Sequence, residues 1–400
     1  MKAERIAVIG GGMSGLSAAV LLARDGCDVT VFERQERIGK KLLITGNGRC
    51  NLSNEDISAE HYQCGDMQKL SRILSGMSAA ERDHFYESLG LSICNVKGGL
   101  YPVSRQASSV IDAFRFTLTE LGVKIMIGYK ACALREGGHI SFENVDKHSD
   151  KPFDAVILSC GGKAGVYGEE KDNAFPLLKK AGHSIKETYP ALTYLKCRED
   201  LKSVAGVRCD AQLRLKTQSG IYTEKGELQL NKDSVSGIPV FQLSRFAPDP
   251  GAVQLEADFL CFIKEGKEEY ERRVRLYPAR TLEDFFAGWL NKKLAVYLIK
   301  KAGLRPSDTV KSSDMERLYR TARHCSFDIC GRGNYREAQL MCGGVPLSEV
   351  NDDLESLRMK NVYLCGELLD VAGECGGYNL HFALCCAHTV WKAIRSKGEN

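Results

Sequence analysis

The chain has 400 residues, of which 44% are hydrophobic and 26% are charged, a composition typical of a globular protein with two or three domains. Its 55 Lys and Arg and 51 Asp and Glu almost cancel, so the overall charge gives no support for nucleic-acid binding. No apolar run approaches the roughly 18 residues that span a bilayer, and the 16 cysteines include no C-x-x-C pair, so we expect no membrane partner and free thiols in the cytoplasm.

The first 33 residues have the pattern of a nucleotide-binding βαβ unit. An apolar strand precedes Gly10, Gly12 and Gly15, which are spaced G-x-G-x-x-G, and a helix rich in Ala and Leu follows. The first glycine permits a tight turn, the second lets backbone amides approach a pyrophosphate, and the third allows helix and strand to pack closely. Glu33 ends the next apolar strand, where a carboxylate is expected to meet a ribose diol.

A basic segment with three glycines follows at 36–54. Its glycines give backbone freedom, its basic side chains bring positive charge, and its Thr and Asn side chains offer hydrogen-bond partners. These residues are Gly39, Gly46, Gly48, Lys40, Lys41, Arg49, Thr45, Asn47 and Asn51. Such a loop is able to wrap a diphosphate or a ribityl chain. Cys50 stands alone in the segment, so we expect a packed small side chain rather than a redox thiol.

The next elements continue an α/β pattern. Apolar residues at helical spacing predict a helix over 104–121. After it we expect a strand at 122–129, a hairpin at 133–143 that turns at Gly137 and Gly138, and a buried strand at 154–162. That last strand ends in Gly161 and Gly162, where bare backbone would approach the adenosine half of a cofactor. An ordinary tight turn explains this glycine pair equally well.

The pattern of polar and apolar residues changes from about residue 190. Polar and apolar residues mix at strand-like spacing, and apolar and polar residues alternate regularly over 253–259. This pattern predicts a small antiparallel β-domain with one solvent-exposed face. Residues 281–301 read as one helix, because Thr281 and Asp284 resemble a capping box and an apolar stripe follows.

The buried-strand pattern returns at 361–370, where Gly366 and Glu367 end a strand. A carboxylate there is able to bond a sugar-alcohol hydroxyl, although a helix N-cap is the competing role. A glycine pair then opens the last helix at Gly377, whose amides would face the ring of a flavin. The pattern of a nucleotide-binding domain occurs at both ends of the chain, and a different pattern of polar and apolar residues lies between them. This arrangement predicts a discontinuous first domain.

One dinucleotide motif leaves a choice between NAD(P) and FAD. No second G-x-G-x-x-G lies in a βαβ setting, and the additional glycine segments far along the chain favour FAD, which needs contacts beyond one βαβ unit. NAD(P)H would then be a transient electron donor. His381, Cys385 and His388 share a helical face, but no carboxylate joins them, so we expect packing rather than a metal site.

Together these motifs resemble the BaiN-like family of bacterial FAD-dependent oxidoreductases, also described as NAD(P)/FAD-dependent or aminoacetone-oxidase-like flavoproteins. The resemblance covers nearly the whole chain, and the segments GNGRCN and GGYNL are its most specific parts. It implies an α/β fold with a Rossmann-like FAD-binding domain of glutathione-reductase type, an inserted β-barrel-like domain and a small helical subdomain. The implied limits are 1–190 with 341–400, 191–270 with 325–340, and 271–324, respectively.

The resemblance also implies which residues line FAD. They are Gly10, Gly12, Ser14, Gly15, Glu33, Arg34, Gly39, Lys40, Lys41, Thr45, Gly46, Asn47, Gly48, Arg49, Cys50, Asn51, Gly161, Gly162, Gly366, Glu367, Gly377, Tyr378, Asn379 and Leu380. The chain departs from the family pattern at 234–244, where Ile238 precedes Pro239, which puts the substrate contacts in question but not the cofactor.

For some members the resemblance implies reduction of a conjugated double bond in a steroid-like or bile-acid-like enone. Three alternatives stay open at this point: an amine oxidase that uses dioxygen, a non-catalytic redox sensor, and a tRNA-modifying flavoprotein, which the balanced charge disfavours. Enone reduction needs a proton donor, and Tyr101, Tyr378 and His381 are the candidates near flavin-lining motifs. Packing is the competing role of both tyrosines. The sequence does not indicate an oligomeric state.

Overall fold

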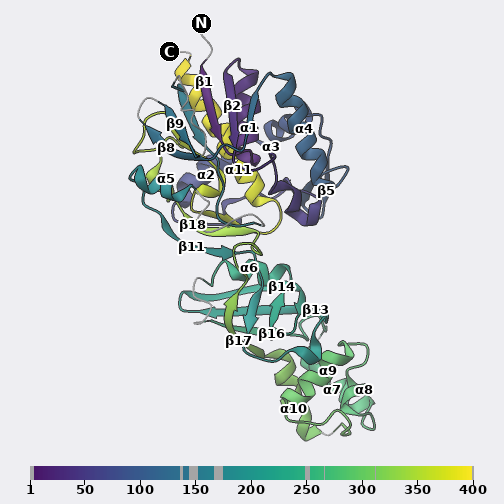
Figure 1. The fold of residues 1–400 in the computed structure, drawn as a ribbon. Coiled ribbons are helices and arrows are strands. Elements are labelled where there is room, and N and C mark those ends of the chain that lie inside the picture. Colours follow the sequence, from purple (N-terminus) through teal and green to yellow (C-terminus); the bar gives the residue numbers. More distant parts are fainter. Residues whose placement is uncertain are drawn as a thin grey trace. The chain divides into compact units, whose positions relative to one another are not determined.

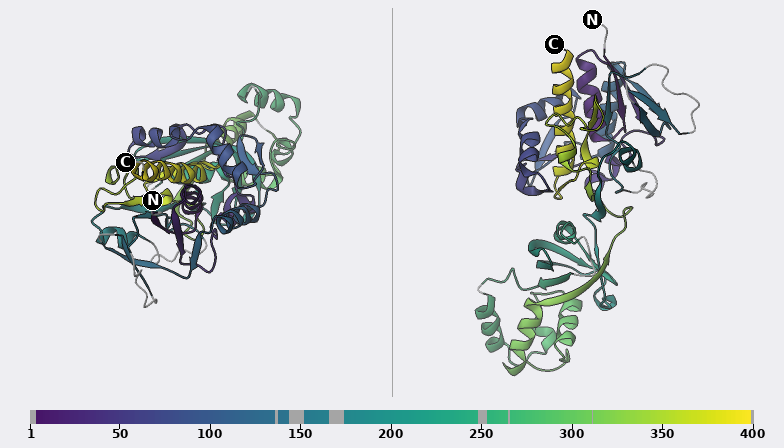
Figure 2. Two further views of the ribbon diagram at one scale, coloured as in Figure 1. Left: turned by 90° about the horizontal axis from the view of Figure 1, so that it is seen from above. Right: turned by 90° about the vertical axis from the view of Figure 1, so that its left-hand side faces the viewer.

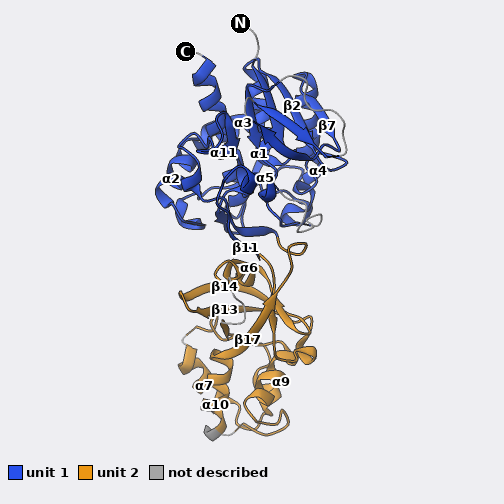
Figure 3. Ribbon diagram, turned by 60° about the vertical axis from the view of Figure 1, so that its left-hand side comes forward, with its two compact units in different colours: residues 1–189, 339–400 blue, residues 190–338 orange. Residues whose placement is uncertain are grey.

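The computed structural model describes residues 4–135, 138–143, 152–165, 174–247, 253–264, 266–310 and 312–398. The chain divides into two compact units, which are coloured separately in Figure 3. Unit 1 combines residues 1–189 with residues 339–400, and unit 2 is the continuous segment 190–338.

A parallel five-stranded sheet forms the centre of unit 1 (Figure 1). Its order is β19 (Val362–Leu364), β10 (Ala155–Leu158), β1 (Arg5–Ile9), β2 (Asp28–Glu33) and β7 (Lys124–Ile127). The three inner strands are almost entirely buried, as expected for a parallel sheet that is covered on both faces. Because β19 pairs with β10, the end of the chain completes a sheet that its beginning starts.

Helices α1 (Met13–Arg24) and α11 (Tyr378–Gly398) lie side by side in unit 1, and the purple and yellow helices of Figure 2 show this packing. Trp391 Nε1 on α11 donates a hydrogen bond of 2.6 Å to Asp25, which caps the end of α1. The predicted helix at 104–121 is confirmed as α4 (Ala107–Glu120), which also packs against α1.

Shorter elements complete unit 1. They are η1 (Leu42–Gly48), β3 (Ser53–Asn54), η2 (Ala59–His61), β4 (Tyr62–Cys64), α2 (Met67–Ser75), α3 (Ala79–Ser88), β5 (Ile93–Val96), β6 (Gly99–Pro102), β8 (Ala131–Arg135), β9 (His139–Phe142), α5 (Phe175–Lys180), β11 (Lys186–Ala191), β18 (Leu340–Gly344), η5 (Leu347–Glu349), η6 (Gly366–Leu368) and β20 (Val371–Gly373). Strands β8 and β9 confirm the predicted hairpin, although Gly137 lies outside the described residues.

Six strands close into a barrel in unit 2. Their order is β12 (Leu195–Cys197), β15 (Ser234–Ser236), β14 (Gly220–Leu230), β13 (Arg208–Thr217), β16 (Gln254–Asp258) and β17 (Cys325–Arg332). The predicted alternation over 253–259 is confirmed, because Leu255 and Ala257 face the core while their neighbours face outward. Helix α6 (Ile238–Ser244) packs against β13, β14 and β15, and η3 (Lys202–Val204) contributes Val204 to the core of unit 2.

Helices α7 (Gly266–Leu276), α8 (Leu282–Phe285), α9 (Lys292–Lys301) and α10 (Ser312–Arg323) complete unit 2. They share one hydrophobic core with the barrel, and Trp289 packs at its margin. The mixed-charge residues 266–275 fall on α7.

The prediction of one helix over 281–301 is wrong, because α8 and α9 are separate. Thr281 does cap α8 by accepting the amide of Asp284 at 3.1 Å. However, Gly288 has a φ of +83°, which interrupts the helical path, and Asn291 starts a new helix by accepting the amide of Lys293 at 2.9 Å. The apolar stripe survives the break because residues from both helices face the same core.

Candidate functional site

The glycine turn of unit 1 joins β1 to α1 through close backbone packing. A Cβ atom on Gly15 would lie 2.0 Å from the carbonyl oxygen of Gly10, so only glycine allows this approach. In contrast, a Cβ atom on Gly12 would meet no atom within 4 Å. Gly12 is the N-cap residue of α1, so no capping side chain accepts a hydrogen bond from the first amides of the helix. Such a helix start is a ready anion site.

Glu33 lies beside this turn at the end of β2, as the sequence predicts. Its Oε2 accepts the amide of Gly11 at 2.8 Å, and its Oε1 accepts the amide of Gln35 at 2.8 Å. Glu33 as a residue is 9% exposed. An ionised carboxylate has about four acceptor positions, so Glu33 keeps capacity for further hydroxyl donors. Arg34, the next residue, is half-buried.

The segment 36–54 runs next to the same turn, because the amide of Gly39 donates to the carbonyl of Gly11 at 2.7 Å. Lys40 pairs with Glu36 at 2.7 Å, and Thr45 Oγ1 donates to the carbonyl of Leu42 at 2.6 Å. Positive φ angles occur at four of the five residues from 46 to 50. These four are Gly46, Asn47, Gly48 and Cys50.

Positive φ is strained for residues with side chains, and strained backbone often marks a ligand clamp. Cys50 adopts φ +57° while completely buried, and burial raises the pKa of its thiol to about 11. The side chain of Cys50 is therefore a packed, protonated thiol. Arg49 beside it is exposed.

Three predicted segments from distant parts of the chain meet at Glu367. The ammonium of Lys41 pairs with its carboxylate, and the amide of Met341 donates to Glu367 Oε1 at 3.0 Å. A Cβ atom on Gly162 would also lie 3.0 Å from Glu367 Oε1. Gly161 faces open space, and Gly366 lies against Ser14 of α1. The strand ends of β10 and β19 thus meet the basic loop.

The glycine pair before α11 forms a second tight contact. Gly377 has a φ of +98°, and a Cβ atom there would lie 2.4 Å from the carbonyl oxygen of Ser53. Asn54 Nδ2 donates to the carbonyl of Gly376 at 2.9 Å. Asn51 Oδ1 lies next to Gly377 and is buried without a hydrogen-bond partner among the described residues. A buried acceptor without a donor indicates an absent ligand or water.

The three proton-donor candidates have different surroundings. His381 has no exposed surface, and its ring nitrogens lie 3.0 Å from Ser53 Oγ and 3.3 Å from Cys385 Sγ. Burial lowers the pKa of His381 to about 4, so it is neutral at pH 7. This geometry gives His381 a packing role. Tyr101 lies beside Gly46 and Gly99.

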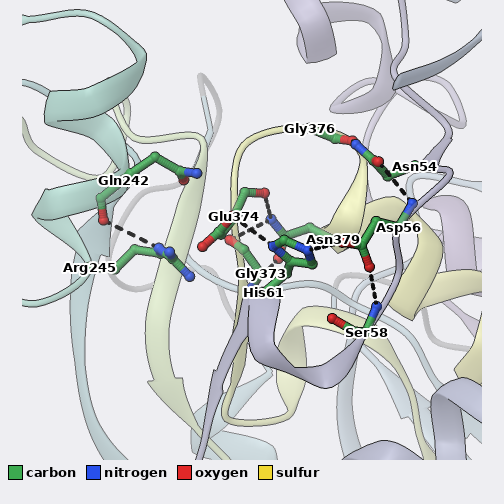
Figure 4. A network of polar contacts seen from close by, with 10 residues as sticks. All are labelled: Asn54, Asp56, Ser58, His61, Gln242, Arg245, Gly373, Glu374, Gly376 and Asn379. Carbon is green, nitrogen blue, oxygen red and sulfur yellow. Dashed lines mark hydrogen bonds and ion pairs between the residues drawn. The ribbon is translucent and has the colours of Figure 1, made fainter. Parts of the chain in front are cut away.

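Tyr378, at the first position of α11, packs against residues that the sequence motifs did not include. The ring of Tyr378 stacks on the imidazole of His61 with 4.5 Å between centroids. His61 lies between two carboxylates, with Nδ1 3.0 Å from Glu374 and Nε2 3.0 Å from Asp56 (Figure 4). His61 sits in a polar stretch without a recognisable motif, so no signal in the sequence indicated this cluster.

Asn379 and Leu380 follow Tyr378 on α11. Asn379 holds the preceding segment in place: its Oδ1 accepts the amide of Gly373 at 2.8 Å, and its Nδ2 donates to the carbonyl of Gly373 at 3.1 Å. Leu380 is half-buried.

Within unit 2, Figure 4 also shows Arg245 Nε, which donates to the backbone carbonyl of Gln242 at 3.3 Å.

The residues of unit 1 fit an FAD molecule. No group of three or more His, Cys, Asp or Glu side chains within the described ranges is arranged to hold a metal. The open space at Gly12 and Gly161 suits phosphate and sugar groups, and the unpaired acceptor of Asn51 suits a ring N–H group. Over the part of the chain that the structure describes, no helix is long and apolar enough to cross a membrane.

Comparison with known proteins supports the same fold. The model of the HI0933-like protein Rossmann domain matches residues 4–393. The 3-dehydro-bile acid delta(4,6)-reductase of Clostridium scindens is 35% identical, and the match covers 98% of this chain and 100% of that protein. The ribosomal RNA dihydrouridine synthase of Haemophilus influenzae is 22% identical, with 97% of each chain covered.

Among solved structures, a flavocytochrome c3 fumarate reductase in its open conformation matches with a TM-score of 0.53 at 12% identity. That match covers 100% of this chain and 79% of the other, and it indicates a shared fold. These matches confirm the BaiN-like resemblance and the α/β fold with a barrel. The chain therefore belongs to the HI0933-like family and has its Rossmann-type FAD-binding fold.

Proposed function

We propose that the protein is an FAD-dependent oxidoreductase that takes hydride from NAD(P)H and saturates a carbon–carbon double bond conjugated to a carbonyl. A steroid-like or bile-acid-like enone is the proposed substrate class. Family membership supports the oxidoreductase activity and the flavin. The substrate class and the nicotinamide donor are the further parts of the proposal.

The observation that carries the proposal is a type of reaction that two relatives share. A delta(4,6)-reductase of a 3-dehydro bile acid saturates double bonds conjugated to a ketone. A dihydrouridine synthase saturates the uracil double bond that is conjugated to a ring carbonyl. Both reactions add a hydride and a proton across an electron-poor double bond, although the two substrates differ greatly in size.

Bound FAD would supply the hydride chemistry, because that reactivity belongs to the cofactor. The uncapped start of α1 at Gly12 would hold the pyrophosphate, and Glu33 would accept hydrogen bonds from the ribose hydroxyls. Asn51 Oδ1 would accept a hydrogen bond from a ring N–H group. Lys41 would close the basic loop over the cofactor through its ion pair with Glu367.

Two cysteines near these segments give a thiol-based redox sensor little support. Burial raises the pKa of Cys50 to about 11 and that of Cys160 to about 12. At neutral pH both residues stay protonated, whereas redox-sensing cysteines react as exposed thiolates. The amine-oxidase alternative gains no specific observation and becomes an outcome of the experiment below.

One observation favours a second candidate function, reduction of uridine in RNA. The positive charge of the chain is concentrated in residues 266–323, which contain fourteen Lys and Arg and eight Asp and Glu. The balance of the whole chain therefore hides a basic helical region, and basic regions favour nucleic acids. The match to a ribosomal RNA dihydrouridine synthase points the same way.

The test begins with anaerobic mixing of the purified, flavin-loaded protein with NADH or NADPH. We expect rapid loss of the visible absorbance of oxidised flavin, followed by its return when a 3-keto-Δ4 steroid is added. Mass spectrometry should then find the steroid with two added hydrogens. Return of colour with a uridine-containing RNA, but not with steroids, would favour the second candidate. Fast bleaching by amines and slow bleaching by NAD(P)H would contradict both.

A further inference from the structure

A cluster of four side chains in unit 1 links the loop before β4 to the start of α11. It consists of Asp56, His61, Glu374 and Tyr378, and we refer to it as the His61 clamp. Figure 4 shows the first three of these residues. His61 is one-quarter exposed, so solvent protons reach its imidazole ring. None of these residues except Tyr378 belongs to the motifs that indicated the cofactor.

The geometry of His61 requires a proton on each ring nitrogen. Both nitrogens lie 3.0 Å from a carboxylate oxygen, Nδ1 from Glu374 and Nε2 from Asp56. A neutral imidazole has one N–H group and one lone pair, so it bonds one carboxylate and repels the other. Only the imidazolium ion donates to both.

The charged groups that face His61 favour this protonated form. Burial lowers the pKa of His61, but its hydrogen bonds to Asp56 and Glu374 and their charges raise it, and the net shift is upward. The same hydrogen bond to His61 is the largest cause that lowers the pKa of Asp56. Tyr378 presents its ring face to the imidazole and is protonated at neutral pH, since burial raises the pKa of its phenol to about 12.

The clamp acts on a segment that is also tied to β4 through its backbone. Strand β20 pairs with β4, with Gly373 opposite Tyr62, and the amide of Glu374 donates to the carbonyl of His61 at 3.0 Å. Tyr62 Oη donates to the carbonyl of Tyr378 at 2.9 Å. The side chain of His61 thus reinforces a connection that fixes the glycine pair before α11.

We propose that protonated His61 is a positioning residue for Tyr378 and the glycine segment 373–377, and that loss of its proton loosens this segment. The proposal rests on the proposed function in one respect: that segment faces the ring of the flavin. Rising pH would then weaken the hold on the ring end of the cofactor while leaving the pyrophosphate end at Gly12 intact.

The first experiment measures amide hydrogen exchange by mass spectrometry in the full-length protein, corrected for the intrinsic effect of pH on exchange. We expect the protection of residues 371–380 to fall as the pH rises through the pKa of His61, because the hydrogen bonds that hold this segment are lost with the proton. His61→Gln should show low protection at every pH and no such step. No step in the wild-type protein, or an unchanged step in His61→Gln, would overturn the proposal.

Two further variants make the result specific. Glu374→Gln keeps the histidine but removes one carboxylate, so the step should move to lower pH; this variant also decides the matter should His61→Gln fail to fold. His324→Gln is the matched control, because His324 also bonds a carboxylate, Glu256 at 3.2 Å, but lies in unit 2. It should keep the wild-type step, and a control that lost the step would contradict the assignment to His61.

The second readout is the rate at which bound flavin is released as a function of pH. Wild-type protein should release flavin several-fold faster above the pKa of His61, and His61→Gln should release it fast at every pH. Absence of flavin from every variant would contradict the proposed function, and the exchange measurement would still decide whether the clamp exists. A rate of flavin release that changes neither with pH nor in His61→Gln would refute the effect on the cofactor.

Discussion

Gly12 and Gly15 are three residues apart, but side chains at the two positions would meet different surroundings. Gly15 touches the carbonyl of Gly10, so any side chain there disrupts the packing of α1 on β1. Gly12 borders open space, so a side chain there fits the protein itself. The same motif therefore contains one glycine needed for folding and one whose value depends on a ligand.

We expect Gly12→Val to yield folded but colourless protein, because the valine side chain fills the space assigned to the pyrophosphate. The measurements are the flavin absorbance of the purified protein and its thermal unfolding. Gly65→Val is the matched control, since Gly65 is exposed, borders open space and has no positive φ. A yellow Gly12→Val protein would contradict the assignment.

His381 should make the protein sensitive to acid. Because burial lowers its folded pKa to about 4, the unfolded chain takes up the proton first as the pH falls below about 6.5. Stability is therefore present above that pH and is lost as the pH falls toward 4, by up to about 3 kcal/mol. His61 has a raised pKa, so its contribution runs in the opposite direction.

Urea unfolding at pH 7 and pH 4 tests this expectation. In His381→Gln the difference between the two free energies of unfolding should shrink by about 3 kcal/mol relative to wild type. His84→Gln is the control because His84 is exposed on α3. An unchanged difference in His381→Gln would show that other groups cause the acid sensitivity.

At the scale of elements, the ion pair of Lys41 and Glu367 joins the basic loop to η6 across 326 positions of the chain. Neither partner is fully exposed: the side chain of Lys41 is 38% exposed and that of Glu367 is 15% exposed. Exposed pairs contribute little because solvent screens them, and this pair is better shielded than most.

A double-mutant cycle with Lys41→Met and Glu367→Gln should give a coupling free energy of about 1 kcal/mol in urea unfolding. The pair of Lys40 and Glu36 supplies the comparison, because the side chain of Glu36 is 63% exposed and the two residues are four positions apart. Its coupling free energy should be clearly smaller, because solvent screens an exposed pair. Equal coupling free energies for the two pairs would show that shielding gives the pair of Lys41 and Glu367 no additional strength.

The sequence predicts local elements well and long-range encounters poorly. The glycine turn, the position of Glu33 and the hairpin of β8 and β9 follow from short motifs, and the structure contains them. The meeting of Lys41 with Glu367 and the His61 clamp depend on how distant segments fold together, which no local pattern records. The break at Gly288 was missed because the apolar stripe continues across it.

At the scale of the whole molecule, the two compact units differ in whether one continuous segment of the chain forms them. Unit 2 is a single continuous segment with its own core, whereas unit 1 needs both ends of the chain. The helices of unit 2 share that core with the barrel, since Phe285 and Leu298 belong to the same cluster as Leu255.

We expect the isolated segment 190–338 to fold and to unfold cooperatively in urea, because it contains a complete core. Circular dichroism and the steepness of the transition measure this. A shorter version without 266–323 should not fold, since it loses part of the shared core. A disordered 190–338 segment would show that unit 2 depends on unit 1.

The chain contains two tryptophans, and each unit carries one of them. Trp289 packs at the margin of the core of unit 2, and Trp391 bonds to Asp25 in unit 1. Replacing either residue by phenylalanine leaves a single tryptophan, whose emission colour and intensity report the melting of one unit alone. The native sequence thus already holds an optical label for each half, and no dye needs to be attached.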